Sequence, residues 1–136
     1  MSDKIIYSGT TQNQSGPNGF ARSRDGLLDI QLPQPHPAAE NLFGAAWSAC
    51  FMSAMGFAAG QRKVVLPSAP SIEATIEVVG RGGEFFLQAR LDVTVPGLSH
   101  EVAQELVEAA HQICPYSKAV RNNIEVETSV VELQAA

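Results

Sequence analysis

The sequence is poor in cysteine and in positive charge. Only two of its 136 residues are cysteine, which is too few for a disulfide-stapled scaffold. Lysine and arginine together number nine and form no cluster, and the formal net charge is −5. A nucleic acid or an anionic membrane therefore has no electrostatic support as a partner.

A targeting segment and internal repeats are also absent from the sequence. The start of the chain, from Met1 to Tyr7, lacks the basic region followed by an apolar run that a secretory signal needs. No low-complexity segment interrupts the remainder. At this length we expect one domain covering residues 1–136, located in the cytoplasm and not in a membrane.

One stretch, from Glu40 to Gly60, carries no charge after its first residue and has Cys50 at its middle. Its composition favours a helix, because Ala, Leu and Met are frequent and no Pro or β-branched residue interrupts it. Apolar groups lie on every face, so protein or lipid must cover both sides. The stretch is long enough to span a bilayer, but its many small residues favour close packing against other helices or a second copy. We expect a homodimer that buries two such helices.

The remaining patterns predict strands around a second helix, an arrangement typical of the α+β class. Asp25-Gly26 is a hairpin signal, the run from Pro33 to Pro37 predicts a stiff connector outside any helix or strand, and Ser99 is a plausible helix N-cap. Pro115 ends the second helix at Cys114 and starts a short third one that runs to Arg121. The predicted strands, antiparallel where they form hairpins, are Lys4–Ser8, Phe20–Arg24, Leu27–Leu32, Ser71–Val79, Phe85–Val95 and Ile124–Leu133.

Cys50 and Cys114 are the residues with an obvious reactive repertoire. Two inert core thiols are one reading, because free cysteine is among the most buried residue types. Cys114 could instead cap the helix that begins at Pro115, whose N–H groups would stabilise its thiolate. Cys50, in mid-helix, would need a cationic partner held by an acid. His111 lies near Cys114, but no further ligands are spaced for zinc, and we expect no metal.

Two long blocks, Glu40–Phe51 and Ala110–Val126, resemble the signature blocks of the organic hydroperoxide resistance (Ohr) proteins within the wider OsmC-like family. Weaker similarity runs nearly from end to end. The resemblance implies a thiol peroxidase that reduces organic hydroperoxides. It also implies an OsmC-like fold, with antiparallel sheets around a long buried helix, in an intertwined dimer whose active sites lie at the subunit interface.

The resemblance assigns roles to individual residues. Cys50 matches the peroxidatic cysteine, which becomes a sulfenic acid, and Cys114 matches the resolving cysteine, which then forms a disulfide with it. A lipoylated partner protein would reduce that disulfide, and no bound cofactor is implied. Glu40 matches the acid that orients a catalytic arginine, although it could also serve only as an acidic first-turn residue.

The loop that should supply this arginine departs from the family pattern. Where the family has Gly-Arg-Asp-Gly, this chain has Gly16-Pro-Asn-Gly19. Arg22 is the preferred substitute and Arg24 the alternative. A redox sensor or a small-ligand-binding protein with slow turnover is therefore a second hypothesis. Trp47 and Phe51 are predicted core aromatics that could also line an apolar entrance for a peroxide tail.

Overall fold

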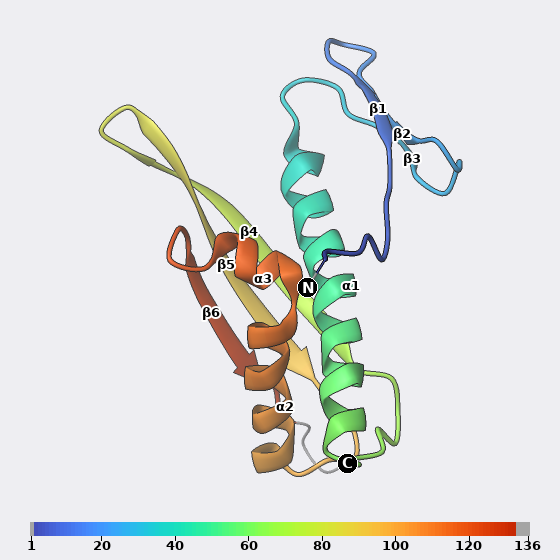
Figure 1. Ribbon diagram of the computed structural model, residues 1–136. Coiled ribbons are helices and arrows are strands. Elements are labelled where there is room, and N and C mark those ends of the chain that lie inside the picture. The colour runs from blue at the N-terminus through green and yellow to red at the C-terminus, as the bar shows by residue number, and fades with distance from the viewer. Residues whose placement is uncertain (1, 133–136) are drawn as a thin grey trace. The chain divides into compact units, whose positions relative to one another are not determined.

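The computed structural model describes residues 2–132, which divide between Ala39 and Glu40 into two compact units. The helix α1, Pro37–Gln61, begins in the first unit and continues through the second (Figure 1). The single domain predicted for residues 1–136 stays a prediction.

The first unit is a three-stranded antiparallel sheet of order β1-β2-β3. Its strands are β1, Thr11–Gln14, β2, Phe20–Ser23, and β3, Asp29–Gln31. The predicted β2–β3 hairpin is confirmed, but the strand predicted at Lys4–Ser8 is wrong, because residues 2–10 form no strand. β1 comes from a polar segment predicted as loop. All four of its residues are polar and exposed, so the sequence of this strand has no alternation of apolar and polar residues that would predict its pairing with β2.

The turn of the β2–β3 hairpin is built by its own polar groups. Gly26 has a φ of +78°, a region that glycine enters without steric cost. The Asp25 carboxylate accepts from the Leu27 N–H over 3.0 Å and also from the Ser23 hydroxyl. These hydrogen bonds, led by the one from Ser23, lower the pKa of Asp25. The turn signal in the sequence thus has a local physical cause.

The second unit contains most of α1, a further sheet and two more helices. The central helix is confirmed, although α1 already starts at Pro37, which was wrongly placed in the connector; proline suits the first turn of a helix because its missing N–H needs no partner there. The Ser99 cap is confirmed, since its Oγ accepts from the Val102 N–H over 3.2 Å. The other elements are β4, Ser71–Arg81, β5, Glu84–Thr94, α2, His100–Ile113, α3, Pro115–Val120, and β6, Glu125–Val130.

The sheet of the second unit has the order β4-β5-β6 and is mixed. β4 and β5 form the predicted antiparallel hairpin, in register from Ser71↔Thr94 to Arg81↔Glu84. β6 instead pairs with β5 in parallel, where only antiparallel sheets were predicted. The chain between them passes through α2 and α3, and such a crossover returns a strand in the parallel direction. Leu133, the predicted end of this strand, lies outside the described residues.

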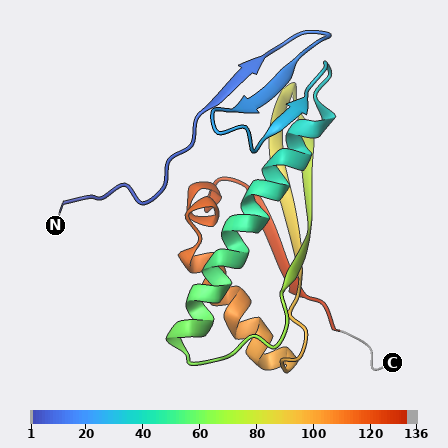
Figure 2. The ribbon, with the colours of Figure 1, turned by 90° about the vertical axis from the view of Figure 1, so that its right-hand side faces the viewer.

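α1 and α2 lie side by side over one face of this sheet (Figures 1 and 2). The inward face of α1 presents Trp47, Phe51 and Met55, all fully buried at a helical spacing. They pack in one core with Leu91 and Val93 of β5 and with the apolar side of α2. α1 is long and apolar enough to cross a membrane by length and composition alone, yet this inward face has the packing of a core helix.

The opposite face of α1 is exposed in the single chain, although both sides were predicted to be covered. Its exposed residues are small apart from one phenylalanine: Ala45, Ala46, Ala49, Ser53, Gly56, Phe57 and Gly60. On the sheet side, a Cβ added at Gly44 would lie 3.4 Å from the side chains of both Ala74 and Ile76. Gly44 therefore allows α1 to approach β4 closely, and the mostly small residues of the opposite face are not covered in the single chain.

Candidate active site

The two cysteines of the chain are in contact. The Cys114 thiol donates to the Cys50 sulfur across 3.2 Å, although 64 residues separate them in sequence. Both are free thiols. A disulfide requires about 2.05 Å between the sulfurs, so a small approach would join them. Cys114 has no exposed surface, whereas Cys50 is partly exposed, so of the two residues only Cys50 reaches solvent.

The ends of two helices place Cys114. Its N–H donates to the Ala110 carbonyl over 2.8 Å, which completes the last turn of α2, and the backbone then leaves the helix at ψ 121° because Pro115 follows. Cys114 is also the N-cap residue of α3, but its side chain makes no capping hydrogen bond. The sulfur is therefore directed to Cys50 and not to the amides of α3.

The Cys50 thiol is held in its protonated form. Burial raises its pKa, the neighbouring Cys114 thiol raises it further, and the backbone N–H of Tyr116 opposes them. The sequence allows the α3 amides to stabilise a Cys114 thiolate, whereas in the structure the amide of Tyr116 acts on Cys50. Within the described part of the second unit, no basic side chain is among the causes of this shift. The thiol therefore lacks there the cation that a reactive thiolate needs.

Two buried aromatic residues, Trp47 and Phe51, pack in the same core as the thiol pair. Trp47 lies one turn before Cys50 on α1, and its indole N–H donates to the Ser117 hydroxyl over 2.9 Å. The Phe43 ring contacts the Trp47 ring edge-on, with the ring centroids 5.9 Å apart. Trp47 and Phe51 are both fully buried, so they do not line an open entrance within one chain. The Trp47–Ser117 contact could not be predicted, because nothing local relates residues 70 positions apart.

His111 lies in the last turn of α2 beside Phe51, with the two ring centroids 6.3 Å apart. Its Nδ1 is buried without a hydrogen-bond partner. Burial, and then the charge of Arg121, lower the pKa of His111, so the ring is neutral at pH 7. Across residues 2–132, no group of three or more His, Cys, Asp or Glu side chains is arranged to hold a metal ion.

The other predicted site residues are Glu40, Arg22 and Arg24. Glu40 is half-buried in the first turn of α1, ten residues before Cys50, where a negative charge suits the helix dipole. Arg22 belongs to the first unit, where its guanidinium pairs with Asp29 at 3.2 Å and lies 4.0 Å from the centre of the Phe20 ring. Arg24 is exposed beside the hairpin turn.

The loop that carries Pro17 is a tight turn. The Gly19 N–H donates to the Gly16 carbonyl over 3.0 Å, with Pro17 and Asn18 as its two central residues. A Cβ at Gly19 would lie 2.4 Å from the Leu32 carbonyl oxygen, so only glycine fits there. The close approach of Leu32 explains Gly19, a φ of +106° explains Gly16, and position 17 is a central turn residue.

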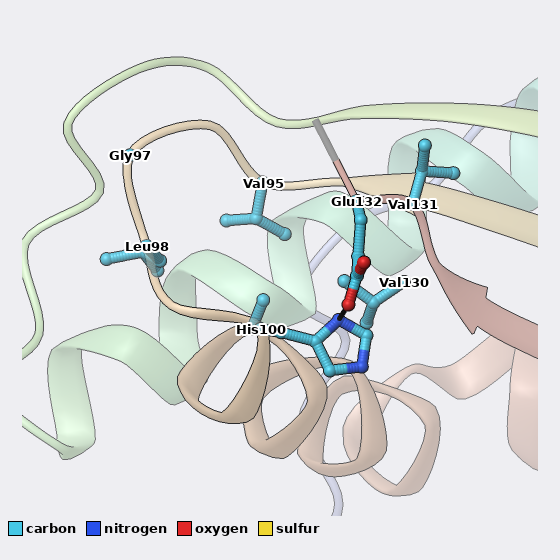
Figure 3. A pocket seen from close by; sticks show the side chains of 8 residues that line it. Val95, Gly97, Leu98, His100, Val130, Val131 and Glu132 are labelled. Carbon is cyan, nitrogen blue, oxygen red and sulfur yellow. Dashed lines mark ion pairs between the residues drawn. The ribbon is translucent and has the colours of Figure 1, made fainter. Parts of the chain in front are cut away.

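A cavity of about 360 Å³ lies at the opposite end of α2 from Cys114. Figure 3 shows the His100 ring directed toward the Glu132 carboxylate, from which its Nδ1 lies 3.5 Å away. The rest of its lining is mainly apolar: Val95, Gly97, Leu98, Ala103, Val130 and Val131. Neither cysteine contributes to this cavity, so it is not part of the thiol site.

The fold and the thiol pair together define an α+β protein in which a cysteine of α1 contacts a cysteine between α2 and α3. Residues 32–129 match the OsmC-like protein family. The chain is 36% identical to the organic hydroperoxide resistance protein of Xanthomonas axonopodis pv. citri over 133 residues, 91% of this chain and 94% of that one. The chain therefore belongs to the OsmC/Ohr family.

Solved structures agree with this assignment. The organic hydroperoxide resistance protein OhrB of Bacillus subtilis superposes with a TM-score of 0.82 at 32% identity, covering 93% of this chain and 100% of that one. An organic hydroperoxide resistance protein from Legionella pneumophila gives 0.84 at 32% identity, covering 95% and 100%. The predicted OsmC-like α+β fold is thus confirmed.

Proposed function

We propose that this protein is a cysteine-based peroxidase that reduces organic hydroperoxides to alcohols. The observation that carries the proposal is the 3.2 Å contact between the Cys50 and Cys114 sulfurs. Its family membership supports the substrate class, because the relatives from Xanthomonas and Bacillus are named for organic hydroperoxide resistance. The partial exposure of Cys50 beside a fully buried Cys114 supports their division into attacking and resolving thiols.

The proposed reaction has three balanced steps. Cys50–SH and ROOH give Cys50–SOH and the alcohol ROH, so the sulfur gains the distal peroxide oxygen. Cys114–SH then displaces the hydroxyl group, which leaves as water while the Cys50–Cys114 disulfide forms. A dithiol, for which we propose the lipoyl group of a partner protein, finally returns both cysteines to thiols and becomes a disulfide itself.

An arginine is needed for the first step, because burial and Cys114 hold the pKa of Cys50 high. We assign this role to Arg22, with Glu40 as the carboxylate that orients its guanidinium. A guanidinium stabilises a thiolate and can donate hydrogen bonds to the peroxide. The exposed guanidinium of Arg22 makes a surface ion pair with Asp29 and a contact with the Phe20 ring. Each of these contacts contributes little at an exposed site, so little free energy opposes the release of the guanidinium.

The proposed working form is a cytoplasmic homodimer. The unpartnered face of α1 between Ala45 and Gly60 supports a dimer, because small residues allow two helices to approach closely. No resident cofactor takes part in the proposed reaction.

Thiol counting tests the proposal. Reduced protein is mixed with cumene hydroperoxide, and free thiols are titrated over time. Both thiols should disappear in the wild type, and Cys50→Ser should keep its one remaining thiol, that of Cys114. Cys114→Ser should accumulate a sulfenic acid that a dimedone probe labels at Cys50. Unchanged thiols in folded wild-type protein would contradict the proposal.

A second function, slow redox sensing, is favoured by the raised pKa of Cys50 and by Pro17 in the loop where the family has arginine. A sensor would be oxidised once and turn over slowly. Steady-state consumption of cumene hydroperoxide with dihydrolipoamide as reductant separates the two. Repeated turnover supports the peroxidase, whereas one oxidation per thiol pair supports the sensor.

A further inference from the structure

The hydrogen bond between Trp47 and Ser117 joins the two elements that hold the thiols. Trp47 is on α1, three residues before Cys50, and Ser117 is on α3, three residues after Cys114. The indole N–H donates to the hydroxyl over 2.9 Å, and both side chains have no exposed surface. The bond therefore lies one helical turn from each sulfur and spans the same pair of helices.

α3 has no stability of its own to hold this position. It contains six residues, Pro115–Val120, and helices of this length do not persist in water without tertiary contacts. A buried hydrogen bond is a strong restraint, because breaking it leaves the indole N–H without either protein or water as a partner. The position of α3, and of the Cys114 that begins it, thus depends on such contacts.

We propose that Trp47 and Ser117 are positioning residues that fix α3 on α1 and so keep the Cys114 sulfur within bonding reach of Cys50. Fixing two groups in contact raises the effective concentration of one toward the other and favours the bond between them. The inference deepens the proposed peroxidase, on which its biological role rests. The dithiol–disulfide equilibrium itself exists without any peroxide.

That equilibrium provides the test. Wild type, Ser117→Ala, Trp47→Phe and the double variant are equilibrated in mixtures of reduced and oxidised dithiothreitol. In this exchange the protein dithiol loses two electrons and two protons as it forms its disulfide, and the oxidised reagent gains them. Each single variant should lower the equilibrium constant for the protein disulfide about tenfold, which is about 30 mV for two electrons. The double variant should have the same equilibrium constant as each single variant, since all three lack the same Trp47–Ser117 hydrogen bond.

Ser129→Ala is the matched control. Ser129 also donates a side-chain hydrogen bond, to Asp92, but it lies on β6 away from the thiols. The equilibrium constant for the disulfide of the Ser129→Ala variant should stay within twofold of wild type. Circular dichroism and thermal melting confirm that each variant is folded, and Trp47→Phe keeps an aromatic ring in the core if Ser117→Ala does not fold.

Two results would overturn the inference: an unchanged equilibrium constant in the folded Trp47→Phe variant, or an equal loss in Ser129→Ala. Failure of the proposed peroxidase looks different. Wild-type protein would then leave cumene hydroperoxide unreduced, while the disulfide equilibrium would still shift in the Trp47 and Ser117 variants.

Discussion

Arg121 donates from its Nη2 to the backbone carbonyl of His111 over 2.8 Å. The bond closes the segment that contains Cys114, because the carbonyl belongs to the last turn of α2 and Arg121 follows the end of α3. A positive charge at the C-terminal end of a helix is favourable by its dipole as well as by the hydrogen bond. The same charge acts on the His111 ring and lowers its pKa.

Replacing Arg121 by methionine should therefore have two effects. The free energy of unfolding in urea should fall by about 1 kcal/mol, the usual size of such a contact. The pKa of His111, followed by NMR, should rise because the charge that lowers it is gone. Arg62→Met is the control, since Arg62 makes a longer bond, 3.4 Å, to the Ala58 carbonyl of α1. An unchanged His111 pKa in Arg121→Met would contradict the electrostatic link.

The pH dependence of stability should carry the signature of His111. Its pKa is lower in the folded protein than the ordinary 6.5, so the unfolded chain takes up a proton first as the pH falls. Stability should be unaffected by this group above pH 6.5 and should decrease below it. The slope from one proton cannot exceed about 1.4 kcal/mol per pH unit.

Urea titrations from pH 7.5 to 5 measure this slope, and His111→Gln should flatten it. Asp25 and Asp92 do not interfere in this pH range. Their pKa values are lowered from the ordinary 3.8, so the stability that they contribute is lost only at more acidic pH. If His111→Gln shows the same slope of stability against pH as the wild type, His111 is not the source of that slope.

Cys114→Ala should lower the pKa of Cys50. Burial is the first cause of the raised pKa of Cys50 and the neighbouring Cys114 side chain is the next, and the variant removes that neighbour. Alkylation by iodoacetamide as a function of pH, with the product located by mass spectrometry, gives the value in each protein. The midpoint for Cys50 should move to lower pH than in wild type. A midpoint that stays or rises would show that Cys114 does not hold Cys50 protonated.

The identity of the arginine can be settled by three substitutions. Arg22→Ala should slow thiol loss to cumene hydroperoxide at least tenfold, roughly the loss of 1.4 kcal/mol of transition-state stabilisation. Arg24→Ala should stay within twofold. Pro17→Arg, which restores the family residue at a central turn position, should accelerate the reaction. Arg22→Ala at the wild-type rate would exclude Arg22, whose ion pair is too exposed for folding to depend on it.

Gly56→Arg tests the proposed dimer. Gly56 is exposed on the unpartnered face of α1, and a Cβ there meets no atom within 4 Å in the single chain. Arginine favours helix over glycine by about 1 kcal/mol, so the chain should stay folded. Analytical ultracentrifugation should show monomers. Gln104→Arg, exposed on α2, should leave the assembly unchanged. Equal assembly states for Gly56→Arg and wild type would place the dimer contact elsewhere.

Much of the fold could be predicted because its signals are local. Alternation marks β4 and β5, Asp25-Gly26 builds its own turn, and Ser99 caps α2. β1 could not be predicted, since a fully exposed polar strand has no apolar period. The parallel direction of β6 depends on where the crossover places it, which no residue in the strand specifies.

The thiol pair was predictable only through the family resemblance, because 64 residues separate its members. The Tyr116 amide carries no side-chain signal, so its action on Cys50 was missed. The roles assigned to Glu40 and Arg22 stay predictions. Strand alternation in the sequence does not determine which arginine side chain would contact the Cys50 sulfur.

The unequal exposure of the two sulfurs fixes the direction of chemistry after oxidation. Cys114 is fully buried, and only Cys50 has surface that an external thiol can reach. A reductant that opens their disulfide would bond to the Cys50 sulfur and expel Cys114 as the leaving thiolate, since exchange follows access to the attacked sulfur. A trapped complex with the reducing partner should therefore be linked through Cys50.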